Sequence, residues 1–186
     1  RYSVLTERAV YNFQSRHGLP ATGYVDLATW KTMGYSEDDW YNLGTYRTPM
    51  KTTRSSNRQD RINAMIQTAI DYKNAGTGYK VGCSGKPGSY VDCSGLIYQC
   101  LYAAGINPSS NIVDHALAVN EYTSANLAAD GKLGQSVTSN SMQRGDIVFY
   151  AKNGKNNVCH IAIYAGNGMI YDSWPGRGVT HRSMNI

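Results

Sequence analysis

The sequence has no long hydrophobic run and very little phenylalanine. Its longest uninterrupted apolar stretches, such as Ile161 to Ala165, are far shorter than the roughly 20 residues that a membrane-spanning helix needs. Leu, Ile, Val and Phe make up about 18% of the 186 residues, a proportion low enough to raise the question of disorder. A net charge of only +5 argues against disorder, and fifteen tyrosines compensate for two phenylalanines. We therefore expect a globular protein with a tyrosine-rich core.

Dense cationic clusters and paired cysteine motifs are also missing. Apart from Arg54, Arg58 and Arg61 the cations are scattered, which gives little support to nucleic-acid binding and suits attraction to an anionic cell wall. Four cysteines are too few for a disulfide scaffold of this length, and no C-x-x-C pair indicates structural zinc. We expect no metal or organic cofactor. A disulfide between Cys83 and Cys159 stays open, because spacing alone does not decide it.

Residues 1–34 are predicted to form a small helical unit. A first helix over residues 7–16, capped by Thr6, would place Ala9, Val10 and Phe13 on one face. Asp26 would cap a second short helix. This segment resembles the second half of the peptidoglycan-binding-1 family in the pattern Thr6-Glu7-Arg8-Ala9-Val10, Phe13-Gln14, His17-Gly18-Leu19-Pro20, Thr22-Gly23, Asp26 and Thr29-Trp30. The resemblance implies a partial wall-binding module that lacks the family's first helix; a helical cap without a ligand is the alternative.

The remaining chain divides into a linker and a larger domain. Residues 35–58 are polar and irregular and are predicted to be the linker, with a domain over 59–186. A helix with apolar residues at helical spacing is expected from Gln59, and a second one begins near Cys93. Short strands are expected at residues 147–150, 158–164 and 169–171. Hairpin turns at Asn153-Gly154 and Gly166-Asn167-Gly168 would connect them. Helices followed by a β-meander predict an α+β fold.

Three residues in this domain suggest nucleophilic chemistry. Cys93 lies where a loop meets a helix, so unpaired N–H groups and the helix dipole would lower the pKa of its thiol; a small buried apolar residue is the alternative. His160 lies on a predicted strand and could take the thiol proton. After the next turn, Asp172 returns beside His160 and could fix the tautomer of its imidazole.

The segments around these residues resemble the NlpC/P60 family from Gln59 to about Ser183. The three matching blocks are Asp92-Cys93-Ser94-Gly95-Leu96, Arg144-Gly145-Asp146-Ile147-Val148-Phe149-Tyr150 and His160-Ile161-Ala162-Ile163-Tyr164-Ala165-Gly166-Asn167-Gly168. The resemblance implies a papain-like fold, with helices packed on an antiparallel sheet. It also implies a bacterial cysteine peptidase that cleaves peptidoglycan stem peptides, most often between γ-D-glutamate and the third-position diamino acid.

The resemblance also assigns roles to single residues. Cys93 would be the nucleophile, His160 the general base and then acid, and Asp172 the orienting third member, where relatives often carry His and others Asn or Gln. Tyr79 matches the Tyr of a Tyr-x-Trp-Gly-Gly stretch that departs from the family here, since the chain reads Tyr79-Lys80-Val81-Gly82-Cys83. The backbone N–H of Cys93, helped by Tyr79, would hold the oxyanion. Candidate substrate-binding residues are Tyr79, Asp92, Ser94 and Trp174, with helix capping and loop bracing as their alternatives.

Other chemically active side chains are expected to be structural. Cys100 falls on an apolar helix face, and Cys159 is expected to point into the layer behind the sheet. Asp146 is expected to hold a turn before a strand. Surface or capping roles, without a specific partner, are expected for His17, His115 and His181.

These observations predict a secreted, cell-wall-associated peptidoglycan hydrolase whose signal segment is absent from a mature or trimmed chain beginning at Arg1. Its partners would be peptidoglycan stem peptides and the bacterial cell wall, with no nucleic acid and no membrane span, and we expect a monomer. Two alternatives stay open. One is a cysteine N-acetylmuramoyl-L-alanine amidase or a transferase of the same fold, and the other is a wall-binding protein with an idle site.

Overall fold

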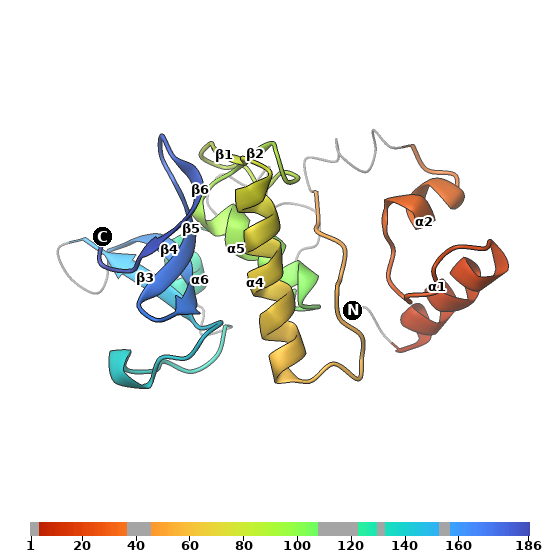
Figure 1. The fold of residues 1–186 in the computed structure, drawn as a ribbon, viewed down its shortest axis with the longest axis horizontal. Coiled ribbons are helices and arrows are strands. Elements are labelled where there is room, and N and C mark those ends of the chain that lie inside the picture. The colour runs from red at the N-terminus through yellow and green to blue at the C-terminus, as the bar shows by residue number, and fades with distance from the viewer. Residues whose placement is uncertain (1–3, 37–45, 108–122, 130–132, 153–156) are drawn as a thin grey trace.

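The described part of the protein contains a small N-terminal pair of helices and a larger body. The computed structural model describes residues 4–36, 46–107, 123–129, 133–152 and 157–186. Helices α1 (Val4–Arg16) and α2 (Leu27–Thr32) stand apart from the other described elements in Figure 1. The elements of the larger body are α4 (Arg58–Asn74), β1 (Gly78–Tyr79), β2 (Tyr90–Val91), α5 (Cys93–Ala103), α6 (Ser124–Ala129), a 3₁₀ turn (Ser139–Ser141), β3 (Ile147–Ala151), β4 (Val158–Gly166), β5 (Met169–Trp174) and β6 (Gly178–Ser183).

A buried glutamine organises the N-terminal helices. The side chain of Gln14 on α1 is fully buried, and its amide donates to the Tyr24 carbonyl at 2.7 Å and to the Thr29 hydroxyl at 2.9 Å. Its side-chain oxygen accepts the Gly23 N–H at 2.9 Å. These bonds satisfy both ends of a buried amide, so the loop between the helices is fixed by a polar centre.

The boundaries of these helices agree only partly with the sequence prediction. Helix α1 already includes Val4, so Thr6 lies inside the helix and does not cap it. Val10 is buried, whereas Ala9 is exposed. Asp26 caps α2 as predicted, because its side chain accepts the Thr29 N–H at 2.7 Å.

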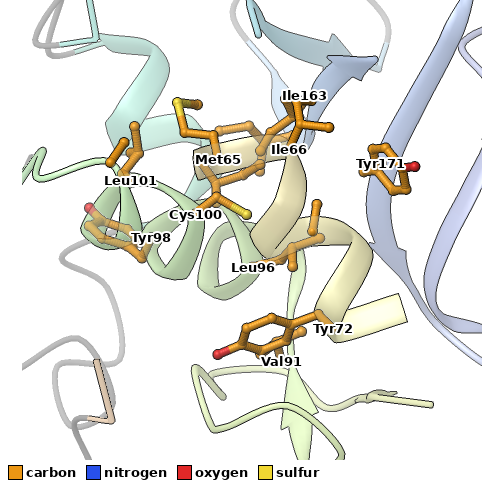
Figure 2. Packing of buried hydrophobic residues seen from close by; sticks show 14 of the residues in the cluster. Met65, Ile66, Tyr72, Val91, Leu96, Tyr98, Cys100, Leu101, Ile163 and Tyr171 are labelled. Atoms are coloured by element: carbon orange, nitrogen blue, oxygen red, sulfur yellow. The ribbon is translucent and has the colours of Figure 1, made fainter. Parts of the chain in front are cut away.

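Two helices form the centre of the larger body. An Asn57–Asp60 capping box fixes the start of α4, one residue before the predicted position. Helix α5 is buried nearly all round, with Leu96, Ile97 and Tyr98 inaccessible to solvent. Figure 2 shows that residues of α4 and α5 pack against one another and against Ile163 and Tyr171 of the sheet. This single core fixes the position of the N-terminus of α5 relative to the strands.

The sheet is an antiparallel meander in the order β3-β4-β5-β6. The turn at Gly166-Asn167-Gly168 joins β4 to β5 as predicted, with all three residues at positive φ. The sequence prediction did not include β6, which pairs along the full length of β5. Helices placed before and against an antiparallel sheet confirm the α+β fold class (Figure 1).

The described half of the predicted linker packs against the body. The fully buried Gln99 of α5 accepts the Thr48 N–H at 2.7 Å, and its amide donates to the carbonyl oxygens of Tyr46 at 2.6 Å and Ser84 at 2.8 Å. Lys51 extends the attachment through a backbone bond to Ala103 and an ion pair with Asp71 of α4. Residues 46–51 are therefore held on α4 and α5. The division of the chain into domains stays a prediction.

Within the ranges that the structure describes, no helix combines the length and apolar character needed to cross a membrane.

Candidate active site

Cys93 is the first residue of helix α5. Asp92 caps this helix: one carboxylate oxygen accepts the Gly95 N–H at 2.7 Å and the Ser94 hydroxyl at 2.9 Å. The second oxygen accepts the Gly82 N–H at 2.7 Å. Asp92 therefore connects the helix start to the preceding loop, and the turn that carries the thiol has a fixed geometry.

Gly95 allows the same turn to lie directly on the chain before it. A Cβ atom at position 95 would overlap the carbonyl oxygen of Cys83 and come within 3.1 Å of the Ser84 Cα. The Ser84 hydroxyl donates to the Gly95 carbonyl at 3.2 Å, and Asp92 donates its N–H to the Cys83 carbonyl at 2.8 Å. The close approach of the two backbones requires glycine at this position.

The electrostatic environment of the Cys93 thiol differs from the sequence prediction. Burial first and the negative charge of Asp92 second raise the pKa of Cys93 to about 11. The backbone N–H groups of Ile161, Ser94 and Cys93 face the sulfur and lower the pKa, but by less. The helix N-terminus thus lowers the pKa of Cys93 as expected, but burial and Asp92 raise it by more. The resting side chain is therefore a thiol.

His160 and Asp172 form a buried hydrogen-bonded pair. The imidazole Nε2 lies 2.8 Å from Asp172 Oδ2; His160 is 5% exposed and Asp172 is inaccessible. The two side chains come from neighbouring antiparallel strands, β4 and β5, as the alternation along these strands predicted. Because Asp172 engages Nε2, it fixes the ring orientation, and Nδ1 is the atom left to exchange a proton with a thiol.

Asp172 has two further side-chain partners on β6. The Thr180 hydroxyl donates to Oδ1 at 2.6 Å, and Arg182 Nη2 donates to Oδ2 at 2.5 Å. Burial of Asp172 raises its pKa, but hydrogen bonds from His160, Arg182 and Thr180 together outweigh it and lower the pKa to about 2. Asp172 is therefore an anion at every pH at which the protein would act.

Two aromatic rings enclose the imidazole. Trp174, the last residue of β5, meets the His160 ring edge-on with centroids 4.8 Å apart. Tyr150 of β3 lies at 5.6 Å from it, and its hydroxyl donates to the Met184 carbonyl at 2.9 Å. Trp174 pairs with Gly178 of β6 within the hairpin, and its ring restricts the movement of His160. A contact of Trp174 with substrate stays a prediction.

Tyr79 lies near the Cys93 thiol. Burial raises the pKa of the half-buried Tyr79, with further contributions from Cys93 and Asp92, which places all three groups close together. Tyr79 also lines an open pocket of about 500 Å³, and no carboxylate lines it. The other lining residues are Lys73, Gly76, Thr77, Gly78, Gly176, Arg177, Gly178 and Val179. Two cations at its wall suit an anionic ligand. The substrate-binding roles of Tyr79, Asp92 and Ser94 stay predictions.

The comparisons with known proteins agree with this geometry. Residues 76–186 match the model of the NlpC/P60 family. The chain belongs to the NlpC/P60 family. Residues 1–33 match the putative peptidoglycan binding domain.

Three relatives of this NlpC/P60 chain are instructive. The peptidoglycan endopeptidase RipA of Mycobacterium tuberculosis is 30% identical over 82 residues, which are 44% of this chain and only 14% of RipA. The NlpC/P60 domain of the peptidoglycan hydrolase SagA is 24% identical, with a TM-score of 0.45 over 66% of this chain and 88% of that one. The match to an NLP/P60 family protein of Staphylococcus aureus, described as similar to a lipoprotein, covers 97% of this chain and 57% of that protein's chain at 18% identity. Its TM-score of 0.51 supports the fold.

The other cysteines of this NlpC/P60 chain are free thiols. No Cys83–Cys159 disulfide is present. Cys100 is buried in the core as predicted, but Cys159 is exposed and does not point into the layer behind the sheet. The reason is a shift in the β3–β4 register between Tyr150 and Ala151, which interrupts the alternation at Cys159.

His17, His181 and Asp146 have partners outside the His160–Asp172 pair. His181 stacks on Tyr171 with centroids 4.4 Å apart, and His17 lies against Phe13, so both have a ring partner that the sequence did not indicate. His115 falls outside the described residues. Asp146 holds the turn before β3 by accepting the Gln143 N–H at 2.7 Å, as predicted. Among the described residues, no group of three potential ligands could hold a metal ion.

Two partners of Asp172, Arg182 and Thr180, were not among the site residues predicted from the sequence. Both lie on β6, on either side of His181. Because side chains alternate along a strand, Thr180 and Arg182 share the face that points toward Asp172. The signal was available in the Gly176 to Gly178 turn, which predicts a hairpin return. Extending the meander by one strand would have placed a cation beside the carboxylate.

Proposed function

We propose that this chain is a cysteine peptidase that cleaves peptidoglycan stem peptides with Cys93, His160 and Asp172. One observation carries the proposal: the backbone N–H of Ile161 faces the Cys93 sulfur, so the thiol lies beside the residue that follows His160. The buried hydrogen bond from His160 to Asp172 supplies an oriented base at the same place. A thiol, an imidazole and a fixed carboxylate are the parts of a nucleophilic triad.

The raised pKa of Cys93 determines the first step. Because the resting thiol is protonated, His160 removes its proton as the sulfur attacks the carbonyl carbon of the stem peptide. Asp172 stabilises the imidazolium that forms and keeps Nε2 engaged, so the proton travels through Nδ1. The attack produces a tetrahedral intermediate with a negative charge on the former carbonyl oxygen.

The first turn of α5 stabilises that oxyanion. The N–H groups of Cys93 and Ser94 precede the repeating hydrogen bonds of the helix and face the sulfur. His160 then protonates the leaving amine, and the peptide bond breaks to leave a thioester on Cys93. Water, deprotonated by His160, hydrolyses this thioester and returns the free thiol.

The proposed substrate bond joins γ-D-glutamate to the third-position diamino acid. RipA, whose name describes a peptidoglycan endopeptidase, and the peptidoglycan-binding match at residues 1–33 support a wall peptide as substrate. The open pocket beside Tyr79, with Lys73 and Arg177 in its wall, suits the carboxylates of such a peptide. We expect action outside the cell, at the wall.

Digestion of a purified stem tetrapeptide, followed by mass spectrometry, tests the proposal. The expected products are L-alanyl-γ-D-glutamate and a dipeptide that begins with the diamino acid. A muropeptide substrate in the same assay tests the sugar–peptide amide. Release of the intact stem peptide from that muropeptide would identify an amidase and contradict the peptidase proposal. Absence of cleavage in both substrates by a folded protein would contradict catalysis altogether.

A further inference from the structure

The Asp172 carboxylate has more partners than a residue that only orients an imidazole needs. Its two oxygens accept hydrogen bonds from His160, Thr180 and Arg182. The Nε atom of Arg182 lies 3.2 Å from each oxygen. Asp172 is inaccessible to solvent, and the Arg182 side chain is 19% exposed. A guanidinium that spans both oxygens of a buried carboxylate forms a strong, directional ion pair.

Arg182 also contacts the second group that restrains the imidazole. Its guanidinium carbon lies 4.4 Å from the centre of the Trp174 ring, and Trp174 meets the His160 ring edge-on. Arg182 therefore touches both the hydrogen-bond partner and the aromatic neighbour of His160. Its own position is fixed by a carboxylate at one edge and by an indole against its face.

The charges around Asp172 can be described element by element. His160 faces it from β4, and Thr180 and Arg182 face it from β6. Tyr150 approaches from β3; burial first and the Asp172 charge second raise the pKa of Tyr150 to about 12, so this phenol is neutral. Arg182 is thus the fixed cation among the described neighbours of Asp172. Without it, a buried anion would face the imidazole uncompensated.

We propose that Arg182 is a positioning residue that neutralises and orients Asp172 and thereby sets the pH range in which His160 exchanges protons. This inference rests on the proposed function for its activity readout. A buried carboxylate beside an imidazole favours the imidazolium, and a guanidinium on the same carboxylate opposes that effect. The Asp172–Arg182 pair keeps the carboxylate's geometry while cancelling most of its charge. Arg182 contacts Asp172 and Trp174, so it acts on His160 through these two side chains.

The test compares Arg182→Met, Asp172→Asn and the double variant by two readouts. One is the pH profile of kcat/KM on the stem tetrapeptide, and the other is the NMR titration of the His160 ring, which does not need catalysis. Arg182→Met should move both curves to higher pH by about one unit, since a single charge at this range shifts a titration by about that much. Asp172→Asn removes the carboxylate and leaves the Arg182 cation without a counter-charge near His160. This variant should therefore move both curves to lower pH.

Further variants separate charge from fold. Arg182→Lys should keep the pH midpoint but lower kcat, because an ammonium cannot span both carboxylate oxygens. Arg54→Met, an exposed arginine in the same body, is the matched control and should change neither curve. If the unpaired carboxylate prevents Arg182→Met from folding, the effect of Arg182→Met is measured in the Asp172→Asn variant instead. Adding Arg182→Met there leaves no buried charge unpaired and should move both curves back toward higher pH.

Unshifted curves in folded Arg182→Met, or identical curves for Asp172→Asn with and without Arg182, would overturn the inference and leave Arg182 a purely structural residue. A wild-type protein that cleaves no stem peptide but shows the expected His160 shifts would contradict the proposed function while supporting the role of Arg182.

Discussion

Replacing Gly95 by alanine tests whether the contact between α5 and the preceding loop positions the nucleophile. The added methyl group would overlap the Cys83 carbonyl oxygen, and Ser84 Cα lies 3.1 Å away, so the obstacle is backbone that cannot rotate aside. Overpacking of this kind costs about 1–3 kcal/mol, whereas alanine in an unobstructed helix would gain up to about 1 kcal/mol over glycine. We expect a loss of about 2 kcal/mol, or roughly 4–8 °C in Tm.

The same substitution should reduce activity more than stability. Cys93 lies two residues before Gly95, and relief of the overlap requires the first turn of α5 to move. A displacement of about 1 Å at a reacting group can cost about 100-fold in rate. The assays are thermal unfolding by circular dichroism and kcat on the stem tetrapeptide at a temperature where the variant is folded.

Gly85→Ala is the matched control, because the nearest obstacle there is the Ser89 hydroxyl, a side-chain atom that can rotate. The nearest backbone atom, the Tyr90 carbonyl oxygen, is 3.0 Å away, whereas a Cβ at position 95 would overlap the Cys83 carbonyl oxygen. Gly85→Ala should lower Tm and kcat less than Gly95→Ala does. A Gly95→Ala protein that is more stable than the wild type, or equally active, would show that the close contact at Gly95 does not position the nucleophile.

Two other predictions concern buried polar groups. Gln99→Leu would remove the hydrogen bonds that Gln99 makes to the Thr48 N–H and to the carbonyls of Tyr46 and Ser84. Urea unfolding should therefore show a free energy of unfolding lower by about 3 kcal/mol or more. The control Gln67→Leu, at an exposed position, should change it little. An equal effect of both substitutions would contradict this. The pKa of Asp172 is lowered to about 2, so its charged form stabilises the fold above pH 4, and that contribution disappears as the pH falls through 2. Wild-type stability should therefore fall by on the order of 2 kcal/mol more than that of Asp172→Asn between pH 4 and pH 2, and parallel curves would contradict the ion pair.

Local patterns in the sequence predicted the elements that carry the site. Apolar residues at helical spacing located α4 and α5, and the Gly166-Asn167-Gly168 turn brought Asp172 back beside His160. Both inferences depend on residues that are close in the chain. The helix start at Cys93 and the strand face of His160 follow from the same short-range rules.

The features that the sequence did not reveal depend on distant partners or on burial. Gln99 bonds to residues about fifty positions away, and no local pattern indicates which buried amide fixes which loop. The exposure of Cys159 follows from a register shift that simple alternation cannot anticipate. The raised pKa of Cys93 depends on how deeply the first turn of α5 is buried, which a cap and a dipole alone do not give.

The central claim is that Cys93 is the nucleophile of a stem-peptide peptidase. The most direct measurement is mass spectrometry of stem tetrapeptide digests made with wild-type protein, Cys93→Ala and the control Cys159→Ala, which removes an exposed free thiol. We expect cleavage after γ-D-glutamate by the wild type and Cys159→Ala, and none by a folded Cys93→Ala. Undiminished cleavage by Cys93→Ala would contradict the central claim.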